Sequence, residues 1–79
     1  MKLVKLEKHN CTGCELVENF LVDEGVSYDK VNVEDNPEVA AEYGVMSVPV
    51  LILLDDNGNE VQRSVGFKPD EISDMLSKI

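Results

Sequence analysis

The most apolar run of the chain, residues 48–54 (VPVLILL), constrains the fold more than any other feature. Its length suits a β-strand, and apolar side chains at both alternating positions are typical of a strand that is buried on both faces. Such a strand lies centrally in a sheet, and other elements must cover both of its faces. We therefore expect an α/β chain built around residues 48–54.

Strand and helix patterns alternate on the N-terminal side of this run. Residues 2–8 predict a strand with one better-buried side, and residues 26–33, which are rich in β-forming side chains, predict a second strand. Between them, residues 12–24 predict a helix that Gly25 ends. The apolar side chains of this helix form one stripe: Leu16, Val17, Phe20 and Leu21.

The remaining segments predict a short helix, a hairpin and a final helix. Pro37 suits the first position of a helix that Asn36 caps and that ends at Gly44. An Asn-Gly turn within residues 55–59 joins the apolar run to a partner strand at residues 60–65. The last helix begins at Pro69 and has an apolar face made of Ile72, Met75, Leu76 and Ile79.

The resulting order is strand–helix–strand–helix–strand–strand–helix (βαβαββα). A length of 79 residues fits one domain, which we expect to span residues 1–79. A strand–helix–strand start followed by a hairpin and a helix predicts an α/β fold, with a four-stranded mixed sheet and three helices on its faces.

The charge balance excludes some classes of partner. Acidic residues outnumber basic ones by 16 to 7, and the net charge is −9. Phosphate binding needs clustered Lys and Arg, so we expect no nucleic acid; a basic protein surface is the better-matched partner. No apolar run approaches the roughly 20 residues of a membrane span, and charges interrupt the N-terminus too often for a signal peptide. We expect a cytoplasmic monomer without membrane association.

Two cysteines, Cys11 and Cys14, lie between the first predicted strand and the first predicted helix. A disulfide between them would stabilise the fold little, because the expected stabilisation grows with the length of the closed loop. The spacing therefore favours reactivity. A free cysteine with a pKa of about 8.5 is only about 3% thiolate at pH 7, and the N–H groups and dipole at a helix N-terminus increase that fraction.

The neighbouring residues have expected roles in the same chemistry. Cys14 can reach back within the first helical turn and resolve the mixed disulfide that Cys11 forms with a substrate. Gly13 leaves the approach to the sulfurs open, and Thr12 offers a hydroxyl near a sulfur. Lys8 adds positive charge close to Cys11.

Two other interpretations of the cysteines compete with reactivity. Together with His9 they supply three zinc ligands, but a structural zinc site takes four and the chain has no other Cys or His, so we expect no metal. Inert core thiols are the second interpretation, and the strand-to-helix position argues against it. His9 itself is either a proton donor or acceptor near Cys11 or an exposed loop residue, and we favour the exposed loop residue.

The arrangement of these motifs resembles the thioredoxin superfamily across nearly the whole chain. The C-x-x-C segment after the first strand, Pro49 before the third strand and the late Gly66 carry the resemblance. It implies a cis peptide between Val48 and Pro49 that faces the cysteines, where the Val48 backbone pairs with a bound substrate. A cis X–Pro bond is rare without such a role, and a trans proline at a strand start is the alternative.

Two segments are similar to the glutaredoxin-like NrdH-redoxins, which supply electrons to class Ib ribonucleotide reductase. Residues 8–11 (KHNC) are similar to their Lys-Pro-Asn-Cys segment, and residues 64–70 (SVGFKPD) to their Ser-Gly-Phe-Arg-Pro-Asp segment. The second segment contains Phe67, which is either a contact surface beside the cysteines or a core plug under the last helix. The resemblance favours surface contact.

The chain also departs from these families. Gly13 stands where NrdH-redoxins usually have Gln, and Lys5 occupies the offset of the buried acidic residue of thioredoxins. The Gly-Gly segment that glutaredoxins use for glutathione is absent. The resemblance therefore implies reduction by a thioredoxin reductase-type flavoprotein rather than by glutathione.

These features predict a thiol–disulfide oxidoreductase that needs no bound cofactor, and the resemblance to the NrdH-redoxins implies that it reduces a ribonucleotide reductase. One alternative is a general thioredoxin-like or glutaredoxin-like protein disulfide reductase without a dedicated client. The other is a non-catalytic module that binds zinc or a partner through Cys11 and Cys14.

Overall fold

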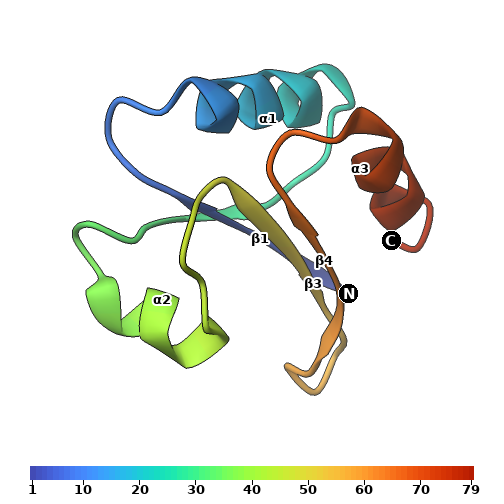
Figure 1. Ribbon diagram of the computed structural model, residues 1–79. Coiled ribbons are helices and arrows are strands. Elements are labelled where there is room, and N and C mark those ends of the chain that lie inside the picture. The colour runs from blue at the N-terminus through green and yellow to red at the C-terminus, as the bar shows by residue number, and fades with distance from the viewer.

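A computed structural model describes residues 1–79, and its elements follow the predicted order βαβαββα (Figure 1). The helices and strands are β1 (Lys2–Glu7), α1 (Thr12–Asp23), β2 (Asp29–Asn32), α2 (Pro37–Tyr43), β3 (Val50–Leu54), β4 (Glu60–Val65) and α3 (Pro69–Leu76).

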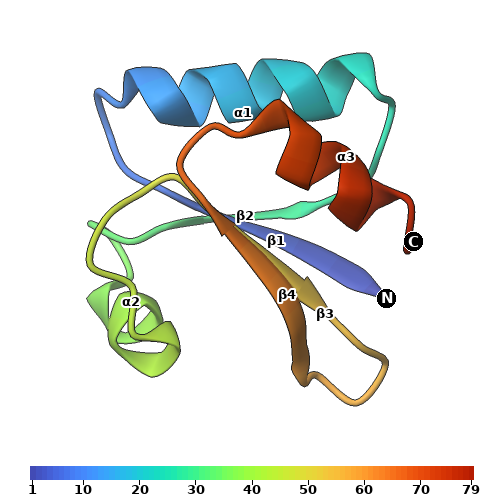
Figure 2. The same cartoon turned by 45° about the vertical axis from the view of Figure 1, so that its right-hand side comes forward.

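The four strands form one mixed sheet in the order β2-β1-β3-β4. β1 pairs with β2 in parallel and with β3 antiparallel, and β4 pairs antiparallel with β3. Helices α1 and α3 lie over one face of the sheet and α2 lies over the other (Figure 2). None of the helices has the length and apolarity of a membrane span. The predicted α/β fold, with β3 inside the sheet, is confirmed.

β3 divides its side chains between two hydrophobic clusters. Leu51 and Leu53 pack in the cluster beneath α1 and α3, whereas Val50, Ile52 and Leu54 pack in the cluster beneath α2. All five residues are buried. The alternation follows from the period-2 geometry of a strand, and it explains why this segment is apolar throughout.

Two strands are shorter than the sequence predicts. β3 begins at Val50 instead of residue 48, because Pro49 has no N–H to donate to a ladder. β2 covers Asp29–Asn32 instead of residues 26–33. It is an edge strand that pairs only with β1, while Val26 and Tyr28 before it pack against the cluster beneath α1 and α3.

The prediction of one better-buried side for β1 is wrong, since both of its sides are buried. Leu3 and Lys5 lie on the side that α1 covers, and Val4 and Leu6 lie on the side that α2 covers. The reason is that β1, like β3, has a neighbouring strand on each edge and helices over each face.

The buried face of α1 is rotated from the predicted stripe. Cys14, Val17 and Leu21 are buried, at spacings of three and four residues, whereas Leu16 is 44% exposed. The helix turns its cysteine toward the sheet, and this rotation carries Leu16 out toward solvent.

The C-terminal helix buries Ile72 and Met75 as predicted, but Ile79 is 58% exposed. The helix ends at Leu76, so Ile79 lies beyond its apolar face.

Helix α2 begins at Pro37 as predicted, but Asn36 does not cap it with its side chain. The Asn36 Nδ2 group donates to the Asn32 carbonyl at 3.1 Å. That contact ties the loop after β2 together and leaves the Asn36 side chain without a hydrogen bond to the helix N-terminus.

Candidate active site

Cys11 and Cys14 form a disulfide at the N-terminus of α1. Cys11 is the N-cap residue, with extended backbone (φ −125°, ψ 104°), and the Cys14 backbone N–H donates to Cys11 Sγ at 3.1 Å. The predicted position of Cys11 just before the helix is confirmed. A sulfur that accepts a free helix N–H is stabilised as a thiolate once the disulfide opens.

The two sulfurs differ in exposure. Cys14 is buried, with 4% of its surface accessible, whereas Cys11 is partly exposed. Thr12 and Gly13 continue from Cys11 as the first residues of α1, and Thr12 is exposed. A substrate therefore meets Cys11 first, which supports the predicted order of attack by Cys11 and resolution by Cys14.

Three segments far apart in the sequence meet beside the disulfide. The Val48–Pro49 peptide is cis, as the resemblance implies. A Cβ on Gly13 would lie 3.1 Å from Pro49 Cδ, so the absence of a side chain lets the two segments approach. The Gly66 N–H donates to the Pro49 carbonyl at 2.8 Å from a backbone with φ of +84°, which favours glycine.

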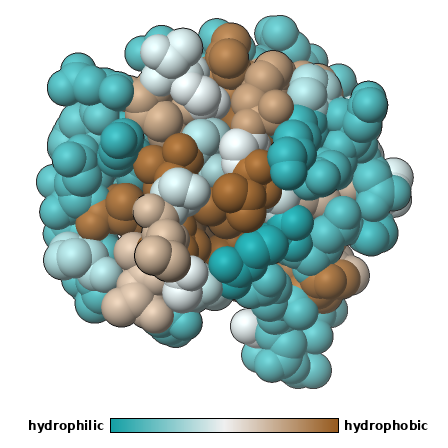
Figure 3. Space-filling model, in the orientation of Figure 1, coloured by the Kyte–Doolittle hydropathy of each residue, from teal (hydrophilic) through white to brown (hydrophobic).

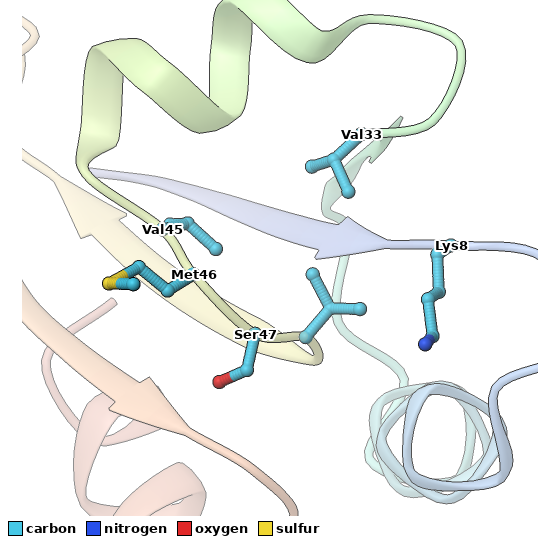
Figure 4. A pocket seen from close by; sticks show the side chains of 6 residues that line it. Lys8, Val33, Val45, Met46 and Ser47 are labelled. Carbon is cyan, nitrogen blue, oxygen red and sulfur yellow. The ribbon is translucent and has the colours of Figure 1, made fainter.

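A hollow of about 250 Å³, lined by apolar residues together with Lys8 and Ser47, adjoins this loop. Its walls come from Lys8, Val33 and residues 45–48, and their side chains surround it in Figure 4. Met46 on its rim is 100% exposed. Apolar side chains also gather in the middle of the face seen in Figure 3, with hydrophilic ones around them. Exposed apolar surface of this kind is typical of a contact site.

Phe67 is partly buried. Its ring meets the edge of Phe20 with centroids 6.3 Å apart and an interplanar angle of 69°. It also packs against the cluster beneath α1 and α3. The ring fills space between α1 and the turn before α3, and contact with a partner through its exposed part stays a prediction.

His9 is an exposed loop residue, as favoured. Its side chain is 64% exposed, and Nε2 lies 3.5 Å from Asp35 Oδ1. No group of three or more His, Cys, Asp or Glu side chains is placed to hold a metal ion. The structure does not bring His9 and the two cysteines together as a set of three zinc ligands.

The sequence interpretation missed a group of charges behind the disulfide. Lys5 is buried and its Nζ lies 2.6 Å from Glu7 Oε1. Both side chains line a cavity of about 160 Å³ that Cys11 and Cys14 also line. The available signal was the alternation along β1, which places Lys5 on the same side as the buried Leu3.

Glu18 on α1 ties this region to β2. It accepts hydrogen bonds from Lys30 Nζ and, at 3.2 Å, from the Tyr28 hydroxyl. The Lys30 contact holds the pKa of Glu18 below its usual range. Burial, followed by the Glu18 charge, raises the pKa of Tyr28.

This pKa shift predicts how stability depends on pH. A carboxyl whose folded pKa is lowered stabilises the fold above its ordinary pKa, 4.5 here, and loses that contribution as the pH falls through the folded value. Glu18→Gln should lower the free energy of unfolding by about 0.5 kcal/mol at pH 7 and by much less near pH 2. Urea unfolding at both pH values measures the difference.

Glu42→Gln is the matched control for Glu18→Gln, because Glu42 is exposed and belongs to no ion pair of the structure. It should leave stability unchanged at both pH values. An equal loss for Glu18→Gln at neutral and acid pH would show that the ionised carboxylate is not the stabilising group.

Comparison with known proteins agrees with this site. The family model of the thioredoxin domain matches residues 2–77. The SPbeta prophage-derived thioredoxin-like protein YosR of Bacillus subtilis is 51% identical over 79 residues, covering 100% of this chain and 99% of YosR. A Staphylococcus epidermidis thioredoxin is 36% identical over 85 residues, covering 99% and 81%. The crystal structure of a Nicotiana alata thioredoxin superposes with a TM-score of 0.81 at 31% identity, covering 96% and 70%.

A mixed four-stranded sheet with a C-x-x-C disulfide at the start of α1 defines a thiol–disulfide oxidoreductase of thioredoxin fold. The chain belongs to the thioredoxin domain family.

Proposed function

We propose that the chain is a dithiol electron carrier in the cytosol that reduces a protein disulfide through Cys11 and Cys14. The observation that carries the proposal is the unequal placement of the two sulfurs: a partly exposed Cys11 at the helix N-cap and a buried Cys14 behind it. A substrate can reach the first sulfur from outside, whereas the second sulfur is largely buried.

The proposed reaction proceeds in two exchanges. The Cys11 thiolate attacks one sulfur of a substrate disulfide, the substrate S–S bond breaks, and one substrate thiolate leaves and takes up a proton. Cys14 then loses its proton and attacks Cys11 Sγ. The Cys11–Cys14 bond forms, the mixed disulfide breaks, and the second substrate thiol leaves. Two electrons and two protons pass to the substrate, and a thioredoxin reductase-type flavoprotein returns them to the carrier.

The proposed client is the C-terminal cysteine pair of a ribonucleotide reductase. The resemblance of residues 8–11 and 64–70 to the NrdH-redoxins supports this client. The client segment would lie along the hollow beside Val48 and Met46, with the Val48 backbone as its pairing edge. An extended chain can bind an exposed backbone edge in this way.

Met46→Asp tests this client surface. Met46 is fully exposed, so an aspartate there costs little stability but puts a charge where an apolar contact is proposed. We expect KM for a protein disulfide to rise about tenfold, equivalent to about 1.4 kcal/mol of binding, with kcat unchanged. Reduction of a small aromatic disulfide, which does not fill the hollow, should be unaffected.

Val22→Asp provides the control for Met46→Asp. Val22 is 63% exposed on α1 and does not line the hollow. The KM of Val22→Asp for the protein disulfide should equal that of the unsubstituted protein. Equal effects of the two substitutions would indicate that added negative charge, and not a contact at Met46, weakens the client.

An NADPH-oxidation assay tests the proposed function. The oxidised protein is offered electrons from thioredoxin reductase and, separately, from glutathione with glutathione reductase. Turnover with thioredoxin reductase alone is expected, and it should continue when an oxidised ribonucleotide reductase is the final acceptor. Turnover with glutathione alone would contradict the proposed electron source and indicate a working glutaredoxin.

A general thioredoxin-like protein disulfide reductase is the second candidate. It is favoured by the thioredoxins among the relatives. Such a protein would reduce insulin and ribonucleotide reductase at similar rates. A dedicated donor would have a higher kcat/KM for ribonucleotide reductase.

A further inference from the structure

A lysine is buried beneath the disulfide, and the two exchanges proposed above assign it no role. The Lys5 side chain is 1% exposed, and its ammonium has one partner, the Glu7 carboxylate at 2.6 Å. Lysine is almost never fully buried unless it is paired. Because burying both charges has a large desolvation cost, such a pair is weak evidence for a stabilising role.

Lys5 shares its surroundings with the reactive sulfurs. The cavity of about 160 Å³ between β1 and the start of α1 is lined by Lys5 and by both cysteines. An ammonium has three N–H groups, and Lys5 uses one of them on Glu7. Two N–H groups therefore have no protein acceptor, in a cavity that Cys14 lines.

Cys14 is the group that needs positive charge from this cavity. Its thiol must ionise before it can attack Cys11, but Cys14 is only 4% exposed, and burial disfavours a thiolate. The helix N-terminus serves Cys11, since the Cys14 N–H itself points at Cys11 Sγ. Another source of stabilisation is required for the second sulfur.

The exposed charged residues of the cavity do not stabilise the Cys14 thiolate. Lys8 in the loop after β1 and Glu15 on α1 also line the cavity, but both residues are exposed. Water and salt screen their effect on a buried sulfur, and their opposite signs offset each other.

Glu18, the remaining acidic residue that lines the cavity, already accepts hydrogen bonds from other residues. Glu18 accepts hydrogen bonds from Lys30 and the Tyr28 hydroxyl, both from the β2 side. Its hydrogen-bond donors thus come from outside the cavity, although the Lys5 charge also lowers the pKa of Glu18. Lys5 is left as the buried cation of the cavity, where low polarity strengthens its interaction with a thiolate.

We propose that the Lys5 ammonium stabilises the Cys14 thiolate while that thiolate resolves the mixed disulfide. Cys14 releases its proton to solvent and its sulfur bonds to Cys11 Sγ. The bond between Cys11 and the substrate breaks, and the substrate sulfur leaves with the electron pair and takes a proton from solvent. Lys5 keeps its three protons throughout, and Glu7 holds it in place. This role rests on the proposed dithiol function.

The test is a titration of the Cys14 thiolate by its ultraviolet absorbance in the Cys11→Ser protein, which has a single thiol. Adding Lys5→Met keeps a chain of similar length and removes the charge. We expect the titration midpoint to rise by about one pH unit, so that the thiolate fraction below the midpoint falls about tenfold. Lys5→Arg, which keeps the charge, should retain the original midpoint.

Lys2→Met is the matched control, because Lys2 is on the same strand but is exposed and paired with Asp29. It should leave the midpoint unchanged. An unchanged or lowered midpoint in a folded Lys5→Met protein would overturn the proposal, and so would equal shifts for Lys2→Met and Lys5→Met.

Glu7→Gln keeps the proposal testable if Lys5→Met fails to fold. Glu7 is 19% exposed, and its substitution removes the counter-charge while leaving the Lys5 cation. The midpoint should then fall, and a rise would contradict the proposal. All of these titrations use no substrate or reductase, so they can fail independently of the proposed function.

Discussion

Cys11→Ser should abolish reduction of protein disulfides, lowering the rate at least about a thousandfold. A serine hydroxyl is not ionised at neutral pH and cannot form a disulfide, although the helix N-terminus that stabilises a thiolate at this position remains in place. The measurement is insulin reduction with thioredoxin reductase and NADPH. The fold should be unchanged by circular dichroism, because Cys11 is partly exposed and lies outside both hydrophobic clusters.

Cys14→Ser should fail at the second exchange instead of the first. The Cys11 thiolate attacks the substrate, one substrate thiol is released, and the mixed disulfide accumulates because nothing resolves it. Mass spectrometry under non-reducing conditions should find the adduct on Cys14→Ser and not on Cys11→Ser. An adduct on Cys11→Ser alone would reverse the assignment of attacking and resolving sulfur.

Leu53→Ala should strongly lower the stability of the fold. Leu53 of β3 is fully buried, in the cluster beneath α1 and α3. Truncating a buried leucine removes apolar contacts and leaves a cavity, which costs about 3 kcal/mol. The total free energy of unfolding of a domain of this size is roughly 4–12 kcal/mol. Thermal unfolding should show Tm lowered by about 4–8 °C for each kcal/mol lost.

Leu16→Ala is the matched control for Leu53→Ala, since it makes the same change at a leucine that is 44% exposed on α1. Its stability should change by less than about 0.5 kcal/mol, because little apolar surface is uncovered and alanine favours the helix. Equal losses at the two positions would mean that burial in the cluster beneath α1 and α3 does not set the cost.

The strands and helices could be predicted because their signals are local. The apolar run before Asp55, the Asn-Gly turn and the prolines at Pro37 and Pro69 each fix a boundary through backbone chemistry. The position of the cysteines is a local signal of the same kind. They lie between a predicted strand and a predicted helix, and this places Cys11 at the helix N-terminus. Such features do not depend on how the elements pack.

The errors concern packing, which a single segment does not determine. Leu16 was expected in the core, but the rotation of α1 depends on the sheet beneath it and on turning Cys14 inward. The partial burial of Phe67 depends in the same way on packing, because Phe20 on α1 provides an edge contact for its ring. The sequence shows Lys5 only as a departure from thioredoxins, because its burial requires β1 to be covered on both faces.

The central claim is that Cys11 and Cys14 cycle together between dithiol and disulfide. The most direct test is a redox titration, in which the protein is equilibrated in graded dithiol–disulfide buffers, trapped with an alkylating agent and weighed by mass spectrometry. The claim predicts one two-electron transition, in which both cysteines become blocked to alkylation together, with a midpoint nearer about −270 mV than about −120 mV, as suits a reductase. Two thiols that never pair in any buffer, or that stay unreactive until a chelator removes stoichiometric zinc, would contradict it.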